Sequence, residues 1–141
     1  MQSEVLLIAG DVAELREGKL YIRGRVKDIL VLSNGEKLPP QDAELAILRD
    51  PVFEQAMLIG EGRPFPVLLS VTQETDEKTL VKRANDQLSS FPRWVRVRRV
   101  IAARAPWDIA SGLMTPTLKL KRAELLKRFA REIEAAYTES G

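Results

Sequence analysis

The sequence predicts a small α+β domain, with helices packed on a small mixed sheet, preceded by a two-stranded hairpin and a hinge. Three observations predict this class. Short apolar runs bounded by glycine, proline and asparagine alternate with longer segments of helical periodicity. The chain has 141 residues, which suits one domain with a modest core. Its composition, 45% hydrophobic and 30% charged, is typical of a globular protein.

The first elements follow from turn residues. Residues 12–23 alternate loosely in polarity around Glu17-Gly18, which predicts a hairpin with Leu20 to Ile22 in its second strand. The polar segment of residues 24–28 contains glycine and charged residues. Such a segment remains solvated while its backbone turns, so we expect a hinge there; an ordinary surface loop is the alternative.

A short strand, a tight turn and a helix come next. Residues 29–32 are apolar and lead into Ser33-Asn34-Gly35, a turn signal because asparagine and glycine tolerate positive φ. Pro39 and Pro40 predict the start of a helix. The N–H groups of the first helical turn have no partner within the helix, so proline, which lacks an N–H, loses no hydrogen bond there. Asp50-Pro51 predicts its end.

The middle of the chain repeats this alternation. Residues 52–59 and 66–71 predict two strands separated by a turn rich in glycine and proline. Thr75-Asp76 predicts the cap of a helix that runs to about Ser89. Phe91-Pro92 predicts where that helix has stopped.

The C-terminal third is more basic. Val95, Val97 and Ile101 predict a further strand, and the basic stretch of residues 93–99 would then form its solvated face. A phosphate-rich partner could use the same charges. Residues 106–117 predict an irregular loop, and residues 122–137 predict one amphipathic helix. The side chains expected to face inward on that helix are Leu125, Leu126, Phe129 and Ile133.

Composition excludes several function classes. The sequence contains no histidine and no cysteine, which removes Ser-His catalysis, thiolate chemistry, disulfides and most zinc sites. We therefore predict no metal site and expect a cytoplasmic location, or one peripheral to a membrane. No apolar run approaches the length of a transmembrane segment, and the start lacks the basic leader of a secretory signal. The net charge of +2 argues against nucleic acid as a partner.

Four segments, in order, resemble the C-terminal part of the adenylate-forming (AMP-binding) superfamily. They are Gly10-Asp11 with Gly18 to Ile22; Gly24 to Ile29; Ser33 to Leu38 with Pro39-Pro40 and Glu44; and Leu113 to Arg122. The last resembles the catalytic-lysine loop of long-chain fatty-acid ligases. The resemblance runs from Gly10 to about Phe129, with departures at Ala9, at Leu118 and in the long loop around Trp107.

The resemblance implies an ATP-dependent acyl-CoA ligase. Such enzymes form an acyl-adenylate from a carboxylic acid and ATP, and then transfer the acyl group to coenzyme A. Lys119 matches the lysine that reaches the adenylation site, where its cation can contact the carboxylate and the α-phosphate. Without the motif, Lys119 would be interpreted as a solvated lysine before a helix. Lys121 and Arg122 are expected to cover the helix face or to meet phosphates loosely.

Other positions match the family residue by residue. Asp11 matches an aspartate that bonds the ribose hydroxyls, and Arg25 matches an arginine near the nucleotide. Lys27 and Asp28 match the hinge, where charged side chains remain hydrated in both rotational states. Gly35 matches a glycine that lines the coenzyme A channel. Turn and loop geometry are the alternative interpretation of all five positions.

The resemblance also implies a division of the chain. Residues 1–23 would end the large-domain region, residues 24–29 would be the hinge linker, and residues 30–141 would be the C-terminal lid domain. The expected partners are the large N-terminal domain of the same enzyme, the acyl substrate and coenzyme A. Mg²⁺ is expected in the full enzyme but not on this chain, and the isolated chain is predicted to be inactive. The alternative is a free-standing, non-catalytic interaction module with the same fold.

Overall fold

The computed structural model describes residues 4–8, 11–16, 19–25, 29–117 and 119–139. The first three strands form an antiparallel sheet of their own, in the order β1-β2-β3. Their bounds are β1 Glu4–Ile8, β2 Asp11–Arg16 and β3 Lys19–Arg25. Strands β2 and β3 are the predicted hairpin, with a bulge between Val12 and Ala13. Strand β1, which we had not predicted, adds a third strand on the other edge of β2.

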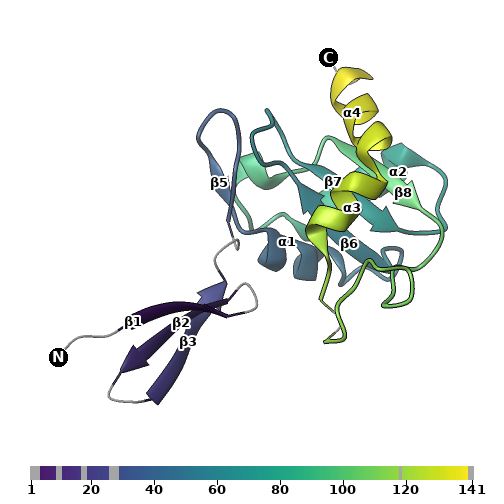
Figure 1. The fold of residues 1–141 in the computed structure, drawn as a ribbon. Coiled ribbons are helices and arrows are strands. Elements are labelled where there is room, and N and C mark those ends of the chain that lie inside the picture. The colour runs from purple at the N-terminus through teal and green to yellow at the C-terminus, as the bar shows by residue number, and fades with distance from the viewer. Residues whose placement is uncertain (1–3, 9–10, 17–18, 26–28, 118, 140–141) are drawn as a thin grey trace.

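The rest of the chain builds an α+β domain, as predicted (Figure 1). Its elements are β4 Leu30–Val31, β5 Lys37–Leu38, α1 Pro40–Ile47, β6 Gln55–Ile59, β7 Val67–Val71, α2 Glu77–Gln87, the 3₁₀ turn η1 Arg93–Val95, β8 Arg99–Ala103, α3 Arg122–Arg128 and α4 Ala130–Glu139. Strand β7 lies between β6 and β8, antiparallel to the first and parallel to the second. Helix α2 is the crossover that the parallel pair requires.

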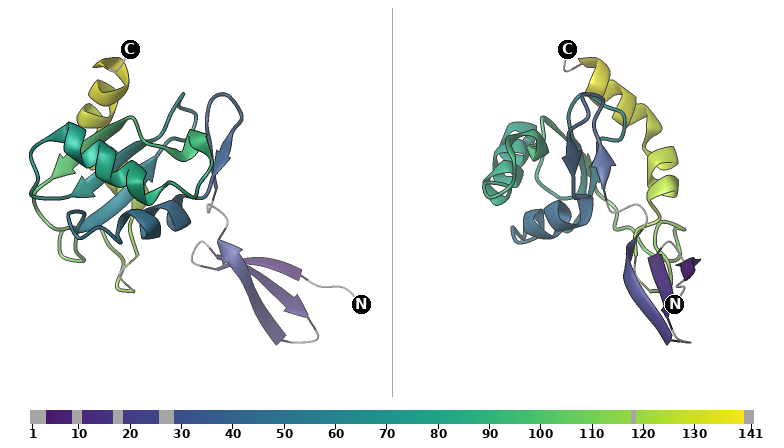
Figure 2. Two further views of the ribbon diagram at one scale, coloured as in Figure 1. Left: turned by 180° about the vertical axis from the view of Figure 1, so that it is seen from behind. Right: turned by 90° about the vertical axis from the view of Figure 1, so that its left-hand side faces the viewer.

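The β6-β7-β8 sheet lies between two pairs of helices, as Figure 2 shows: α1 and α2 cover one face, α3 and α4 the other. Alternation along β6 supplies both faces. Ala56 and Leu58 pack with the core under α1 and α2, whereas Met57 and Ile59 pack with Leu125 and the other core. A strand buried on both sides explains why β6 and β7 read as nearly continuous apolar runs.

The turn between β4 and β5 follows its sequence closely. Gly35 has a φ of +89°, a conformation that favours glycine. Its N–H donates to the carbonyl of Leu32 (2.9 Å), and the Asn34 side chain accepts the N–H of Glu36 (3.0 Å). The predicted start of α1 at the two prolines is also confirmed, with Pro40 as its first residue.

The prediction that a strand begins near Val95 was wrong. Both side chains are buried, but Val95 belongs to η1 and β8 begins only at Arg99. The backbone of Val97 pairs instead with the Asn85 side chain, which donates to its carbonyl (3.0 Å) and accepts its N–H (2.9 Å). The alternate spacing of Val95 and Val97 therefore indicated that both side chains are buried, but not that they belong to a strand. The predicted strand with a solvated basic face does not form across residues 93–98.

The single C-terminal helix was also a wrong prediction. The helix is interrupted at Phe129, whose φ and ψ of −106° and 21° lie between α3 and α4. The break accompanies an edge-to-face contact between Phe129 and Trp107, with ring centroids 6.4 Å apart. Leu125 and Ile133 are buried as predicted, whereas Leu126 is 43% exposed.

Candidate functional site

Lys119 lies on a short loop that its own hydrogen bonds close. The isolated bridge between Met114 and Leu120 joins the two arms of the loop. Thr115 holds Lys119 twice: its N–H donates to the Lys119 carbonyl (2.8 Å), and its hydroxyl accepts the Lys119 N–H (3.1 Å). A second hydroxyl, that of Thr117, lies 3.0 Å from the Thr115 hydroxyl. The threonines of the motif therefore shape the loop that presents the lysine.

The first arm of the loop is attached to β6 through Gln55. The Gln55 amide donates to the Met114 sulfur (3.4 Å) and to the Trp107 carbonyl (3.0 Å). Its oxygen accepts the backbone N–H of Trp107 (2.7 Å). Because Trp107 is buried against the core, this amide connects the irregular loop of residues 106–117 to a rigid strand.

The second arm ends in an ion pair between Arg122 and Glu44. The guanidinium of Arg122, at the start of α3, donates to both carboxylate oxygens of Glu44 on α1, at 2.6 and 2.7 Å. The Glu44 side chain is 8% exposed and also accepts the backbone N–H of Leu58 (2.6 Å). This bidentate pair joins residues 78 positions apart.

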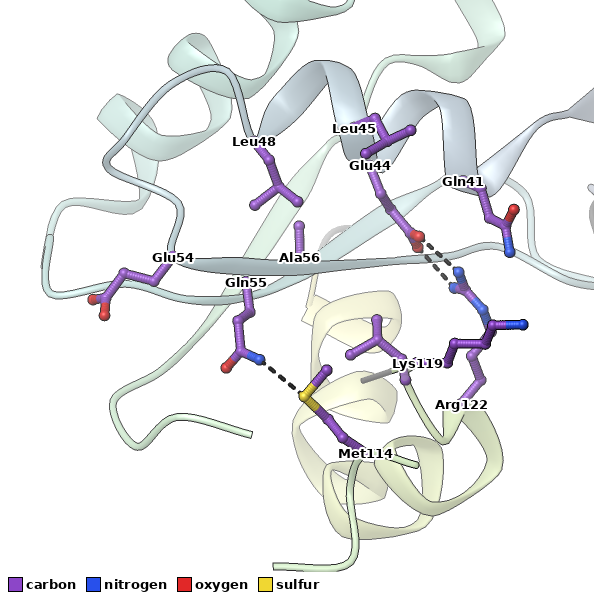
Figure 3. A pocket seen from close by; sticks show the side chains of 11 residues that line it. Gln41, Glu44, Leu45, Leu48, Glu54, Gln55, Ala56, Met114, Lys119 and Arg122 are labelled. Atoms are coloured by element: carbon purple, nitrogen blue, oxygen red, sulfur yellow. Dashed lines mark hydrogen bonds and ion pairs between the residues drawn. The ribbon is translucent and has the colours of Figure 1, made fainter. Parts of the chain in front are cut away.

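These residues surround a cavity of about 360 Å³, shown in Figure 3. Its lining residues come from α1 and the residue after it, from β6 and the residue before it, from the lysine loop and from the start of α3: Gln41, Glu44, Leu45, Leu48, Glu54, Gln55, Ala56, Met114, Lys119, Leu120 and Arg122. Lys119 and Arg122 lie at one end and Glu54 at the other. On the α1 side, Leu45, which is 67% exposed, and Leu48 form an open apolar surface beside Gln41 and Glu44. The cavity therefore combines the Lys119 cation with apolar contact area and with the carboxylates of Glu44 and Glu54.

A second hollow, of about 290 Å³, lies beside the Gly35 turn. Its lining residues come from the turn, from the β6–β7 connection and from the basic stretch: Leu32, Asn34, Glu36, Pro64, Phe65, Pro66, Arg93, Trp94, Arg96 and Arg98. The indole N–H of Trp94 donates to the Lys37 carbonyl (2.8 Å) and so joins the two segments. Arg98 lies over the Phe65 ring, 4.9 Å from its centroid. We call this hollow, with its three exposed arginines, the basic groove.

The last arginine of the basic stretch has a different role. Arg99 donates to both oxygens of Glu77 at the start of α2, at 2.6 and 3.1 Å. The Arg99 hydrogen bond holds the pKa of the Glu77 carboxyl below its usual range. Arg83 lowers the pKa of Asp50 in the same way, through bonds of 2.6 and 2.7 Å. Both pairs join helices to neighbouring segments outside the two hollows.

The structure brings together some of the predicted site residues. Lys119 lines the cavity described above, and Gly35 lies between two residues that line the basic groove. Asp11 and Arg25 occupy directly opposite positions where β2 pairs with β3. Lys27 and Asp28 lie outside the described residues.

Sequence reasoning missed the partners of the lysine loop. Glu44 entered only as part of a motif, and Arg122 was expected to cover the helix face; its bidentate pair with Glu44 corrects that expectation. Gln55 carried no signal, because a glutamine at a strand end is common. The one hint in the sequence was the position of Glu44 on a predicted helix, next to Ala43, which was expected to face the core. A glutamate at such a position is rarely buried unless it is paired.

In the part of the chain that the structure describes, no group of three metal-binding side chains is close enough to hold an ion. Within the same residues, no helix has the length and apolarity needed to cross a membrane.

Comparison with known proteins identifies similar sequences and folds. The family model of the AMP-binding enzyme C-terminal domain matches residues 27–141. A chloroplastic long-chain-fatty-acid–[acyl-carrier-protein] ligase of Arabidopsis thaliana is 31% identical over 132 residues, which cover 86% of this chain and 18% of that protein. A long-chain-fatty-acid–CoA ligase of Rattus norvegicus is 29% identical, covering 99% of this chain and 25% of that protein. The chain thus spans about a fifth to a quarter of the length of these relatives.

Solved structures show the same fold. The A domain of the carboxylic acid reductase from Segniliparus rugosus, in complex with AMP and a co-purified carboxylic acid, superposes with a TM-score of 0.78 at 20% identity. The match covers 94% of this chain and 23% of that one. A fatty acyl CoA synthetase of Mycobacterium tuberculosis superposes with a TM-score of 0.58 at 24% identity, over 87% of this chain and 24% of its own.

Proposed function

The chain belongs to the AMP-binding enzyme C-terminal domain family, and on that premise we propose that it is the lid domain of an ATP-dependent acyl-CoA ligase. The proposed substrate is a carboxylic acid of the fatty-acid class, in keeping with the named activities of the relatives. The observation that carries the proposal is Lys119 on a closed loop at the end of a cavity whose lining includes three leucines. A cation held beside apolar surface suits a reaction between a fatty carboxylate and a phosphate ester.

In the first half-reaction, a carboxylate oxygen attacks the α-phosphorus of ATP, and the bond to pyrophosphate breaks. Negative charge then gathers on the α-phosphate oxygens in the transition state. The ammonium of Lys119 is proposed to bond to the carboxylate and to the α-phosphate together and to stabilise that charge. The adenine, the polyphosphate and Mg²⁺, which neutralises phosphate charge, are assigned to the large domain.

Asp11 and Arg25 are proposed to contact the nucleotide together. Their directly opposite positions in the β2–β3 pair place the two residues side by side on neighbouring strands. An aspartate accepts two hydrogen bonds from the ribose hydroxyls, and an arginine can donate to a ribose or phosphate oxygen. Lys27 and Asp28 remain the proposed hinge.

In the second half-reaction, the thiolate of coenzyme A attacks the acyl carbonyl of the adenylate, and AMP leaves. We propose that the Gly35 turn lines the path of the thiol arm and that the basic groove beside it binds the phosphates of the nucleotide end. Arg93, Arg96 and Arg98 are exposed, and the adjacent Trp94 offers an aromatic face to adenine. Since the Arabidopsis relative is named for an acyl-carrier-protein acceptor, the assay should offer both acceptors.

The test measures the two half-reactions separately in the ligase that carries this domain. Lys119→Ala should lower ATP–pyrophosphate exchange on the order of 100-fold or more, while the transfer from preformed acyl-adenylate to coenzyme A changes little. Lys127→Ala is the matched control, because this lysine is exposed on α3 and outside the cavity. Equal exchange rates in the Lys119 variant and the wild type would remove the catalytic assignment and favour the non-catalytic interaction module.

The isolated chain supplies a second test. Most of the groups that position ATP are assigned to the large domain, so the chain alone should show no ligase turnover. Adding ATP at modest concentration should leave its Tm unchanged, because only a ligand that binds the folded state stabilises it. A rise of several degrees would contradict this division of the site.

A further inference from the structure

We propose that Glu44 and Arg122 are positioning residues that set the place of Lys119 for adenylation; the inference rests on the catalytic assignment of Lys119 made above. Arg122 follows Lys119 by three residues and is the first residue of α3. Its guanidinium is one of the points at which the second arm of the lysine loop is attached to the rest of the domain, beside the backbone bond from Lys121 to Leu113 (2.9 Å). Neither residue needs to contact a substrate to exert this effect.

This attachment fixes the orientation of the Glu44 carboxylate, because the carboxylate accepts three hydrogen bonds. Two come from Arg122 at 2.6 and 2.7 Å, and the third comes from the N–H of Leu58 at 2.6 Å. Leu58 lies in β6, an edge strand of its sheet, and its N–H faces away from β7 toward the carboxylate. A planar fork on one side and a strand on the other fix the carboxylate in orientation as well as in place.

The two arms of the loop are therefore held on the same strand. Gln55, at the start of β6, holds the Met114 arm, and Leu58, near its end, holds the Arg122 arm through Glu44. Lys119 lies between these two points, on a loop that Thr115 closes. Because a displacement of about 1 Å at a reacting centre can lower a rate on the order of 100-fold, an arm released at one end should affect the step that uses Lys119.

The same domain contains a matched ion pair for control. Arg83 donates to both oxygens of Asp50 at 2.6 and 2.7 Å, and Asp50 also accepts a backbone N–H, that of Val52 (3.1 Å). The Asp50 side chain is 10% exposed, against 8% for Glu44. Neither Asp50 nor Arg83 lines the cavity of Lys119. The two pairs thus share their chemistry, and their carboxylates are similarly buried. They differ in position, because only Glu44 and Arg122 line the cavity of Lys119.

The experiment compares Arg122→Lys with Arg83→Lys in the intact ligase. Both changes keep the positive charge, so no buried carboxylate is left without a cation, but both remove the bidentate fork. We expect Arg122→Lys to lower ATP–pyrophosphate exchange about tenfold or more in kcat, with transfer from preformed acyl-adenylate within about twofold of wild type. Arg83→Lys should leave both half-reactions within about twofold. The Tm of each variant is measured to compare their folding.

The outcomes separate this inference from the proposed function. If Lys119→Ala abolishes exchange and Arg122→Lys does not lower it, the positioning role is wrong and the ligase assignment stands. If Arg122→Lys lowers both half-reactions, or Arg83→Lys lowers exchange equally, the effect is one of general stability and the inference fails. If Lys119→Ala leaves exchange intact, the proposed function itself fails. A selective loss in Arg122→Lys alone supports the positioning role.

Discussion

The ion pair between Glu44 and Arg122 predicts that one substitution lowers the stability of the chain and that a second substitution partly restores it. Arg122→Ala removes the cation from a carboxylate that is 8% exposed and leaves it with one hydrogen bond, from the Leu58 N–H. Breaking a buried ion pair from one side costs about 3–5 kcal/mol. Because the Arg122 side chain is 30% exposed, water can reach the vacated position, and we expect a cost at the lower end of this range, about 3 kcal/mol.

A second substitution should restore stability. Glu44→Gln in the Arg122→Ala background removes the unpaired charge, while the amide oxygen can still accept the Leu58 N–H. The double variant should therefore be more stable than Arg122→Ala alone by about 1 kcal/mol or more. The measurement is urea unfolding at pH 7, followed by circular dichroism, with m-values compared to confirm that the same surface is exposed.

The order of stability of the three proteins tests this reasoning. Wild type should be the most stable, the double variant intermediate and Arg122→Ala the least stable, about 10 °C below wild type in Tm. A double variant less stable than Arg122→Ala would refute the reasoning, since it would mean that the Glu44 charge is not desolvated. Arg122→Ala within about 0.5 kcal/mol of wild type would show that the pair is not formed in solution.

Three further changes test other parts of the structure. Burial raises the pKa of Tyr137 to about 12, so its contribution to stability is present below pH 10 and is lost between pH 10 and 12; Tyr137→Phe should flatten the unfolding free energy over that range in urea titrations. Arg83 lowers the pKa of Asp50, so that contribution is present above about pH 4 and is lost as pH falls; Asp50→Asn should weaken the acid dependence of the urea midpoint between pH 6 and 3. In the intact ligase, Arg96→Ala should raise the KM for coenzyme A about threefold to fivefold and leave that for pantetheine, which lacks the nucleotide phosphates, unchanged; equal effects on both thiols would contradict the basic groove.

Much of the local structure was predictable because its causes are local. The turn at Gly35 requires a residue that accepts a φ of +89°, and asparagine beside it supplies the side-chain acceptor. The start of α1 at Pro40 follows from the fixed φ of proline. The lysine loop also follows from its own sequence, since Thr115 closes it within five residues.

The errors share a different cause. Val95 and Val97 were assigned to a strand because buried valines at alternate positions resemble one, yet Asn85 of α2 takes the hydrogen bonds that a neighbouring strand would have taken. Leu126 was placed inside together with its neighbour Leu125, but adjacent helical residues point about 100° apart, and Leu126 is 43% exposed. In both places, apolar residues were assigned to a pattern that the packing of the folded chain does not follow.

The sequence by itself determined the family, the elements and the candidate lysine, because turn residues, prolines and a short motif act within a few positions of the chain. Only the tertiary structure decided what surrounds Lys119 and where the basic stretch lies. The Glu44–Arg122 pair spans 78 positions, and the bond from Trp94 to Lys37 spans 57. Such contacts depend on how helices and strands pack, because many arginines and glutamates of one sequence could pair equally well and only the folded chain brings a particular two within hydrogen-bonding distance.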